Sequence, residues 1–141
     1  MSDAHIILIA DSSPDICALL VDLLTEEGYV PRCCPSEQVT ADEIRSASAD
    51  LVILDLRSDE AGAMLLLLEQ LRQHDATHGL PIVISSTNPR LLDDLAVPLR
   101  RLRCGTLIKP FDVDQLLRCI AQYLGREQAH QESGCFERAY V

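Results

Sequence analysis

Polar residues with useful chemistry stand directly after the apolar runs of this sequence. Asp11 and Asp55 each end one run, Ser85 and Ser86 end a third, and Lys109, the only lysine, ends a fourth. Short continuous apolar runs are typical of strands buried on both faces, as in a parallel sheet covered by helices. The carboxyl ends of such strands meet at one edge of the sheet, where ligands bind. We therefore expect these side chains to gather in one functional site.

Two carboxylates that meet repel each other unless a proton or a cation lies between them. With oxygen ligands the natural cation is Mg²⁺, which binds one or two carboxylates together with water and phosphate oxygens. Lys109 adds a fixed positive charge, and the set suits phosphoryl transfer to Asp55, giving an aspartyl-phosphate. The alternative is a structural ion pair of Asp11 and Lys109 beside Asp55, which is less favoured because burying charges for stability alone gains little.

The composition indicates one globular domain. The chain has 141 residues, of which 48% are hydrophobic, enough to bury a core. The apolar runs are too short to cross a bilayer, and residues 1–5 lack the cationic start of a secretory signal. We expect a cytoplasmic protein without a membrane partner.

The net charge of −10 argues against a nucleic-acid partner, because phosphate contacts need a clustered basic surface. The charge is uneven: residues 1–85 carry about −11 and residues 86–141 about +1. Arg100, Arg101 and Arg103 lie close together in the second part. They form either a solvated helix face or a docking surface for an acidic partner or a second subunit.

The hydrophobic pattern predicts five strands alternating with five helices. The strands are expected at residues 6–10, 29–34, 51–54, 82–85 and 106–108, and the helices between Ser12 or Ser13 and Gly28, over 36–48, over 63–73, from Asn88 to about Val97 and from Asp112 to Leu124. Pro31 indicates an edge strand, and Pro98 should end or kink the fourth helix. Strict alternation favours a doubly wound α/β domain with right-handed crossovers.

The six cysteines contain no CxxC pair, so we expect free thiols. Cys17 and Cys119 fall on apolar helical faces and should belong to the core. The adjacent pair Cys33-Cys34 could be a redox sensor, but two neighbouring residues of a strand are the favoured interpretation.

The sequence resembles the receiver domain of two-component response regulators. The matching stretches are residues 7–16, 50–56, 81–86 and 109–111, and their order and spacing together are specific. The resemblance runs from residue 6 to about 124, so it implies a receiver domain over 1–125 and a short, flexible tail over 126–141. It also implies a flavodoxin-like (α/β)5 fold with a five-stranded parallel sheet in the order 2-1-3-4-5.

The resemblance implies a role for each site residue. Asp55 accepts a phosphoryl group from a histidine kinase or phosphotransfer protein, with at most self-phosphorylation and slow self-dephosphorylation as enzymatic activity. Asp11, Asp55 and the backbone carbonyl of Arg57 bind Mg²⁺, Ser86 contacts a phosphate oxygen, and Lys109 pairs with the phosphate. Output to a downstream protein, or a homodimer, would use the face of helix four, strand five and helix five.

Three positions depart from the family pattern, and one of them is Asp59, which replaces the usual proline of the loop after Asp55. Ser12 stands where receivers carry a second metal-binding acid, so it can act only as a neutral ligand, for instance through water. Mg²⁺ should then bind about 10–100-fold more weakly, unless Asp59 or Glu60 substitutes. Thr106 stands where receivers carry a Tyr or Phe ring that moves when the hydroxyl of the Ser86 position shifts, so the switch pair Ser86 and Thr106 cannot couple in the usual form.

These departures leave a second interpretation open, a phosphorylation-independent pseudo-receiver that acts as a protein-binding module. A metal-dependent phosphatase is disfavoured because Arg57 occupies the position of the acid that such enzymes need. A nucleotide switch is disfavoured because the chain contains no GxxxxGK[ST] motif.

Overall fold

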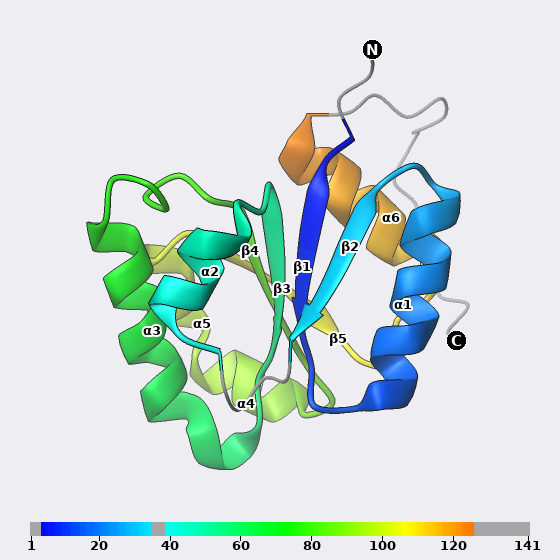
Figure 1. Ribbon diagram of the computed structural model, residues 1–141. Helices are drawn as coiled ribbons and strands as arrows, with labels where there is room; N and C mark the ends of the chain where they lie inside the picture. Colours follow the sequence, from blue (N-terminus) through cyan, green and yellow to red (C-terminus); the bar gives the residue numbers. More distant parts are fainter. Residues whose placement is uncertain (1–3, 35–38, 126–141) are drawn as a thin grey trace.

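The computed structural model describes residues 4–34 and 39–125, which form a five-stranded parallel sheet. The strands are β1 (Ile6–Ala10), β2 (Val30–Cys34), β3 (Leu51–Asp55), β4 (Ile82–Ser86) and β5 (Cys104–Ile108). Their order is β2-β1-β3-β4-β5, with β2 and β5 at the two edges (Figure 1). The predicted fold and strand order are confirmed, whereas the tail predicted over 126–141 lies outside the described residues.

Helices cover both faces of the sheet. They are α1 (Pro14–Glu26), α2 (Ala41–Ala47), the 3₁₀ turn η2 (Ser58–Glu60), α3 (Ala61–Gln73), α4 (Pro89–Asp94), α5 (Ala96–Arg101) and α6 (Val113–Leu124). Helices α1 and α6 pack on one face, while α2 to α5 pack on the other (Figure 1). The residues described include no helix long and apolar enough to cross a membrane.

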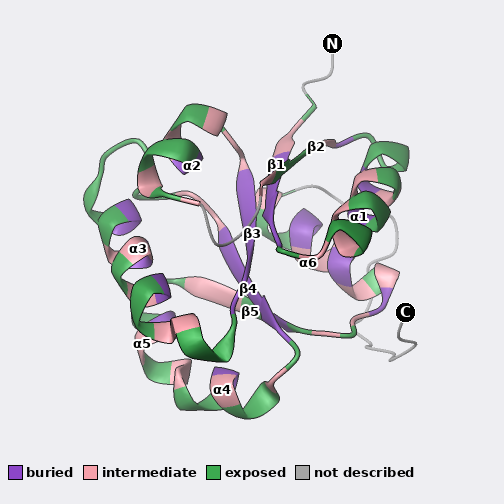
Figure 2. Ribbon diagram, turned by 60° about the horizontal axis from the view of Figure 1, so that its bottom comes forward, coloured by how far each residue is buried: buried purple, intermediate pink, exposed green. Residues whose placement is uncertain are grey.

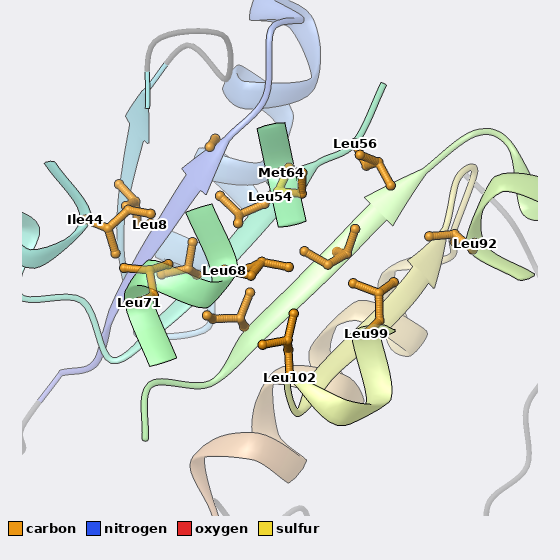
Figure 3. Close-up of a cluster of buried hydrophobic side chains, with 14 residues drawn as sticks. Leu8, Ile44, Leu54, Leu56, Met64, Leu68, Leu71, Leu92, Leu99 and Leu102 are labelled. Atoms are coloured by element: carbon orange, nitrogen blue, oxygen red, sulfur yellow. The ribbon is translucent and has the colours of Figure 1, made fainter. Parts of the chain in front are cut away.

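The central strands are buried on both faces, as the unbroken apolar runs predicted. All five residues of β3 and of β4 are buried (Figure 2). On the α2–α5 side, Leu54 of β3 belongs to one buried cluster with Leu68 and Leu71 of α3 and Leu99 of α5 (Figure 3). Removing this apolar surface from water stabilises the sandwich, and this rigid core positions the strand ends.

Local signals set the helix ends. Ser13 caps α1 by accepting a hydrogen bond from Ile16 N at 3.3 Å. Gly28, at φ +90°, then turns the chain out of α1. Asp112 and Gln115 form a capping box at the start of α6. Ser13, the later of the two predicted candidates, is therefore the cap of α1.

The prediction that Pro98 ends or kinks the fourth helix near Val97 was wrong. The helix breaks at Leu95, which caps α4 and opens α5, and Pro98 lies in the first turn of α5. The backbone N–H groups of a first helical turn have no intrahelical acceptor, so a proline costs little there. Strand β5 also begins at Cys104, two residues before the predicted start.

One buried arginine joins several connections at the end of the sheet away from Asp55. Arg72 of α3 donates hydrogen bonds to five backbone carbonyls, at distances of 2.7–3.2 Å. Three of these belong to the α3–β4 connection (Thr77, His78 and Leu80), and two precede β5 (Leu102 and Arg103). Burial lowers the pKa of Arg72. The five carbonyls accept hydrogen bonds from its guanidinium, and Arg72 thereby holds the α3–β4 connection and the residues before β5 together.

Candidate functional site

The register of the sheet brings the predicted site residues to one edge. Ala10 pairs with Leu54, so Asp11 lies beside Asp55, the last residue of β3. Asp55 pairs with Ser85, the neighbour of Ser86. Because Ser86 pairs with Ile108, Lys109 follows at the same edge. Residues separated by up to 98 positions therefore meet at the carboxyl ends of β1, β3, β4 and β5.

Lys109 joins the two carboxylates. Its Nζ donates to Asp11 Oδ2 at 2.6 Å and to Asp55 Oδ1 at 2.9 Å. All three side chains are largely buried: 14% of the Lys109 side chain is exposed, 5% of Asp11 and 12% of Asp55. Burial alone would lower the pKa of Lys109, but the hydrogen bonds and charges of Asp11 and Asp55 outweigh it, and the pKa is raised. Lys109 is therefore a fixed cation shared by two acids.

Backbone contacts hold Asp11 in place. Its Oδ1 accepts a hydrogen bond from Ser13 N at 2.9 Å, and its own N–H donates to the Cys34 carbonyl at 3.3 Å. The Cys17 thiol donates to the Asp11 carbonyl at 3.5 Å. The turn into α1 and the edge strand β2 thus both orient this carboxylate.

Ser86 is buried at the end of β4, with 2% of its surface exposed. Its Oγ accepts a hydrogen bond from Asn88 N at 3.0 Å, and its carbonyl accepts one from Lys109 N at 2.8 Å. Its neighbour Ser85 instead donates to the Leu54 carbonyl at 3.5 Å. Ser86 is therefore linked to the β4–α4 turn on one side and to the backbone of Lys109 on the other.

The oxygen donors at this edge fit Mg²⁺. They are the carboxylates of Asp11 and Asp55, which Lys109 joins. The carbonyl of Arg57 follows two residues beyond Asp55 in the chain, and it accepts a hydrogen bond from Glu60 N at 2.9 Å. A carbonyl oxygen has two lone pairs, so this bond leaves one free for a cation. Carboxylates and carbonyls are the ligands that Mg²⁺ prefers.

Only two carboxylates, those of Asp11 and Asp55, come together at this edge among the residues that the structure describes. Across residues 4–34 and 39–125, no three His, Cys, Asp or Glu side chains gather closely enough to hold a metal ion. Ser12 is exposed beside Asp11. Asp59 is 74% exposed and lies 3.9 Å from Arg57 Nε, and Glu60 caps α3 without a side-chain hydrogen bond. Neither acid of this turn joins the carboxylates at the strand ends.

Of the two residues predicted as a switch pair, Ser86 ends β4 and Thr106 lies in β5. Thr106 is exposed in β5 and, with Leu92, Leu99 and Ile108, lines a hollow of about 260 Å³ between β5 and the α4–α5 pair. Its short side chain leaves that space open.

The three predicted surface arginines do not share one environment. Arg100 and Arg101 are exposed in the last turn of α5. Arg103 lies beyond α5 at φ +61°, and its Nη2 donates to the His78 carbonyl at 3.1 Å. Arg103 is thus tied to the α3–β4 connection.

An apolar groove adjoins the site and was not predicted. It has a volume of about 540 Å³ and runs between α1 and the start of α6, lined by Ile16, Leu20, Phe111 and Leu116 and reaching Lys109. The spacing of the apolar residues predicted both helices, but only the three-dimensional structure shows that their apolar faces leave a groove beside Lys109.

Comparison with known proteins identifies the family. A family model for the response regulator receiver domain matches residues 7–121. The chain therefore belongs to the response regulator receiver domain family, which confirms the resemblance drawn from its sequence motifs.

Curated relatives carry the same domain within longer proteins. The chain is 30% identical over 116 residues to the nitrogen assimilation regulatory protein NtrX of Azorhizobium caulinodans, covering 81% of this chain and 25% of the relative. It is 32% identical over 117 residues to the transcriptional regulatory protein GlrR of Escherichia coli, and this match covers 83% of this chain and 25% of GlrR. The chain thus spans about a quarter of the length of these relatives.

Solved structures support the fold. A sensor protein from Polaromonas sp. JS666 is 26% identical, with a TM-score of 0.69, and the match covers 87% of this chain and 98% of that one. A response regulator from Thermotoga maritima gives a TM-score of 0.73 at 19% identity, over 87% and 99% of the two chains.

Proposed function

We propose that this chain is a phosphoacceptor switch of a two-component phosphorelay and that Asp55 accepts the phosphoryl group. The observation that carries the proposal is the bridge from Lys109 Nζ to Asp11 and Asp55 at 2.6 and 2.9 Å. It places a fixed cation beside a nucleophilic carboxylate at the ligand-binding edge of a parallel sheet. An incoming phosphoryl group can take the place of one carboxylate in that contact.

The residues divide the reaction between them. Lys109 holds Oδ1 of Asp55, which leaves Oδ2 to attack phosphorus. The new O–P bond forms as the P–N bond to the donor histidine breaks, and the imidazole leaves with the electron pair and takes up a proton. Lys109 and the Ser86 hydroxyl then donate hydrogen bonds to the phosphoryl oxygens, a positioning and charge-neutralising role typical of phosphoryl transfer.

Asp11, Asp55 and the Arg57 carbonyl would hold Mg²⁺, which when bound neutralises charge on the transferred group. Asp11 is oriented for this by Ser13 N. The site formally has two carboxylates and one ammonium, so its net charge of about −1 favours a divalent cation.

A fluoroberyllate analogue, which mimics a phosphoryl group on an acidic side chain, tests the proposal. With Mg²⁺ present, the amide NMR signals of Asp55, Ser86 and Lys109 should shift in the native protein. They should stay in place in Asp55→Asn, which keeps the size of the side chain but lacks the carboxylate. Equal responses in the two proteins, or none in either, would contradict phosphoryl capture at Asp55.

We further propose a histidine kinase or phosphotransfer protein as phosphodonor and a downstream protein as target, in the cytoplasm. Output, or a homodimer, would use the face of α4, α5, β5 and α6, where Val97 and Ile108 are 66% and 48% exposed large hydrophobic residues. Arg100 and Arg101 at its rim suit an acidic partner.

A pseudo-receiver that binds its partner without phosphorylation is the second candidate. It is favoured by Ser12 in place of an acid and by Thr106 in place of a ring. If millimolar Mg²⁺ and the analogue leave the spectrum unchanged while the protein is folded, the binding module is the better account.

A further inference from the structure

Two cysteines from different elements meet on the flank of Asp11. Cys17 lies on α1 and Cys33 on β2, and the Cys33 thiol donates to the Cys17 backbone carbonyl at 3.9 Å. The Cys17 thiol in turn donates to the Asp11 carbonyl at 3.5 Å. Cys33 is exposed, while Cys17 is partly buried and packs against the α1–α6 side of the core.

The adjacent residue Cys34 is not part of this contact. Successive side chains of a strand point to opposite faces of the sheet, and Cys34 packs against the core on the α2–α5 side. The sequence neighbours Cys33 and Cys34 are therefore separated by the sheet, while Cys17 and Cys33, 16 positions apart, are in contact.

We propose that Cys17 and Cys33 are a modification site, at which a peroxide converts the two thiols into a disulfide. The Cys33 thiolate attacks one peroxide oxygen, the O–O bond breaks, and a sulfenic acid and hydroxide form. The Cys17 thiolate then attacks the Cys33 sulfur, the S–S bond forms, and the S–O bond breaks with loss of hydroxide. The two thiols lose two protons and two electrons in all, and the peroxide is reduced to two molecules of water.

The geometry explains why the second step follows the first. Exposed Cys33 is open to a small oxidant, and Cys17 is already in contact with it, so a sulfenic acid formed there meets a resolving thiol at once. Although Cys33 is exposed to a small oxidant, partial burial raises the pKa of its thiol to about 12. The first step is therefore slow, and the site responds to sustained peroxide.

The modification would reach the phosphoacceptor edge directly. The Cys17 thiol donates to the Asp11 carbonyl at 3.5 Å, and Asp11 N donates to the Cys34 carbonyl at 3.3 Å. A disulfide removes the first of these donors and links α1 covalently to β2 beside Asp11. This inference does not depend on phosphorylation of Asp55.

The test uses the reduced full chain, millimolar hydrogen peroxide, alkylation of the remaining thiols after denaturation, and mass spectrometry. We expect a mass loss of two hydrogens, two fewer alkylated cysteines, a cross-linked peptide containing Cys17 and Cys33, and full reversal by dithiothreitol. Cys17→Ser and Cys33→Ser should each abolish the cross-link. Cys34→Ser, the matched control, should retain it.

The peptide map of the unaltered protein decides the matter even if a variant fails to fold. A cross-link that joins other cysteines would overturn the proposal. So would oxidation of Cys33 to a sulfinic acid with Cys17 still alkylated, or two thiols that remain free after prolonged exposure. In the oxidised protein the amide NMR signal of Asp11 should also shift, and dithiothreitol should restore it.

Discussion

Ser12→Asp should strengthen Mg²⁺ binding and weaken the metal-free protein. Ser12 follows Asp11 at the end of β1 and is exposed, so an aspartate there can reach a cation held by Asp11 and Asp55. The change takes the formal charge of the site from about −1 to about −2, which attracts a divalent cation more strongly. The same extra charge repels the existing carboxylates when no cation is present.

The expected changes in Mg²⁺ affinity and in stability follow from the exposure of Ser12. Changes in the surroundings of a bound metal typically alter affinity 10–100-fold, which corresponds to about 1.4–2.8 kcal/mol. The cost to the metal-free protein should be about 1 kcal/mol, the size of an exposed charge interaction. The variant should thus unfold more easily than the native protein without Mg²⁺ and gain more stability when Mg²⁺ is added.

Isothermal titration calorimetry and urea unfolding, each with and without Mg²⁺, measure the two effects. Ser46→Asp is the matched control: it adds the same charge near the C-terminal end of α2, which leads to the start of β3 and so lies away from the site. It should leave Mg²⁺ affinity unchanged. If Ser12→Asp binds Mg²⁺ no more tightly than the native protein, Asp11 and Asp55 do not form a magnesium site.

Substitutions of Lys109 and Arg72 test what holds the domain together. Lys109→Met should cost about 2 kcal/mol at neutral pH, because two carboxylates lose their charged hydrogen-bond donor. Since the pKa of Lys109 is raised above 10.5, its stabilisation is fully present below that pH and is lost as pH rises through the folded-state pKa. Urea unfolding should therefore show native protein and variant converging at high pH, and a constant gap would refute this origin. Arg72→Met should cost about 3 kcal/mol in the same assay because buried carbonyls lose their donor. Arg103→Met, the matched control, removes an exposed arginine whose side chain donates to the His78 backbone carbonyl, and it should cost less than about 1 kcal/mol. Equal losses of stability in the two variants would mean that Arg72 does not hold these connections together.

The central sheet and the acidic site could be predicted from sequence because local pattern and topology agree there. The apolar runs around Leu54 and Ile84 are continuous, so they indicate strands buried on both faces. Once the strands are parallel, the residues that follow them must share an edge. The meeting of Asp11, Asp55 and Lys109 follows from that rule alone.

Other features depend on contacts that the local pattern does not encode. Pro98 looks like a helix breaker, but the helix breaks three residues earlier, at Leu95, so Pro98 lies in the first turn of α5. From its sequence position, Arg72 would be expected to be a solvated charge on an apolar helix. In the structure, its guanidinium donates to carbonyls of two connections that are distant in sequence. Cys33 and Cys34 are two neighbouring residues of a strand, as predicted, but only the packing of α1 on the sheet brings Cys33 to Cys17. In each case tertiary packing decides a question that residue type leaves open.

The intact mass of the protein after incubation with acetyl phosphate and Mg²⁺ tests the central claim most directly. We expect the mass to rise by one phosphoryl group, the group to map to the peptide that contains Asp55, and Asp55→Asn to show no increase. An unmodified native protein that is folded and saturated with Mg²⁺, or a phosphoryl group found on another residue, would contradict the account.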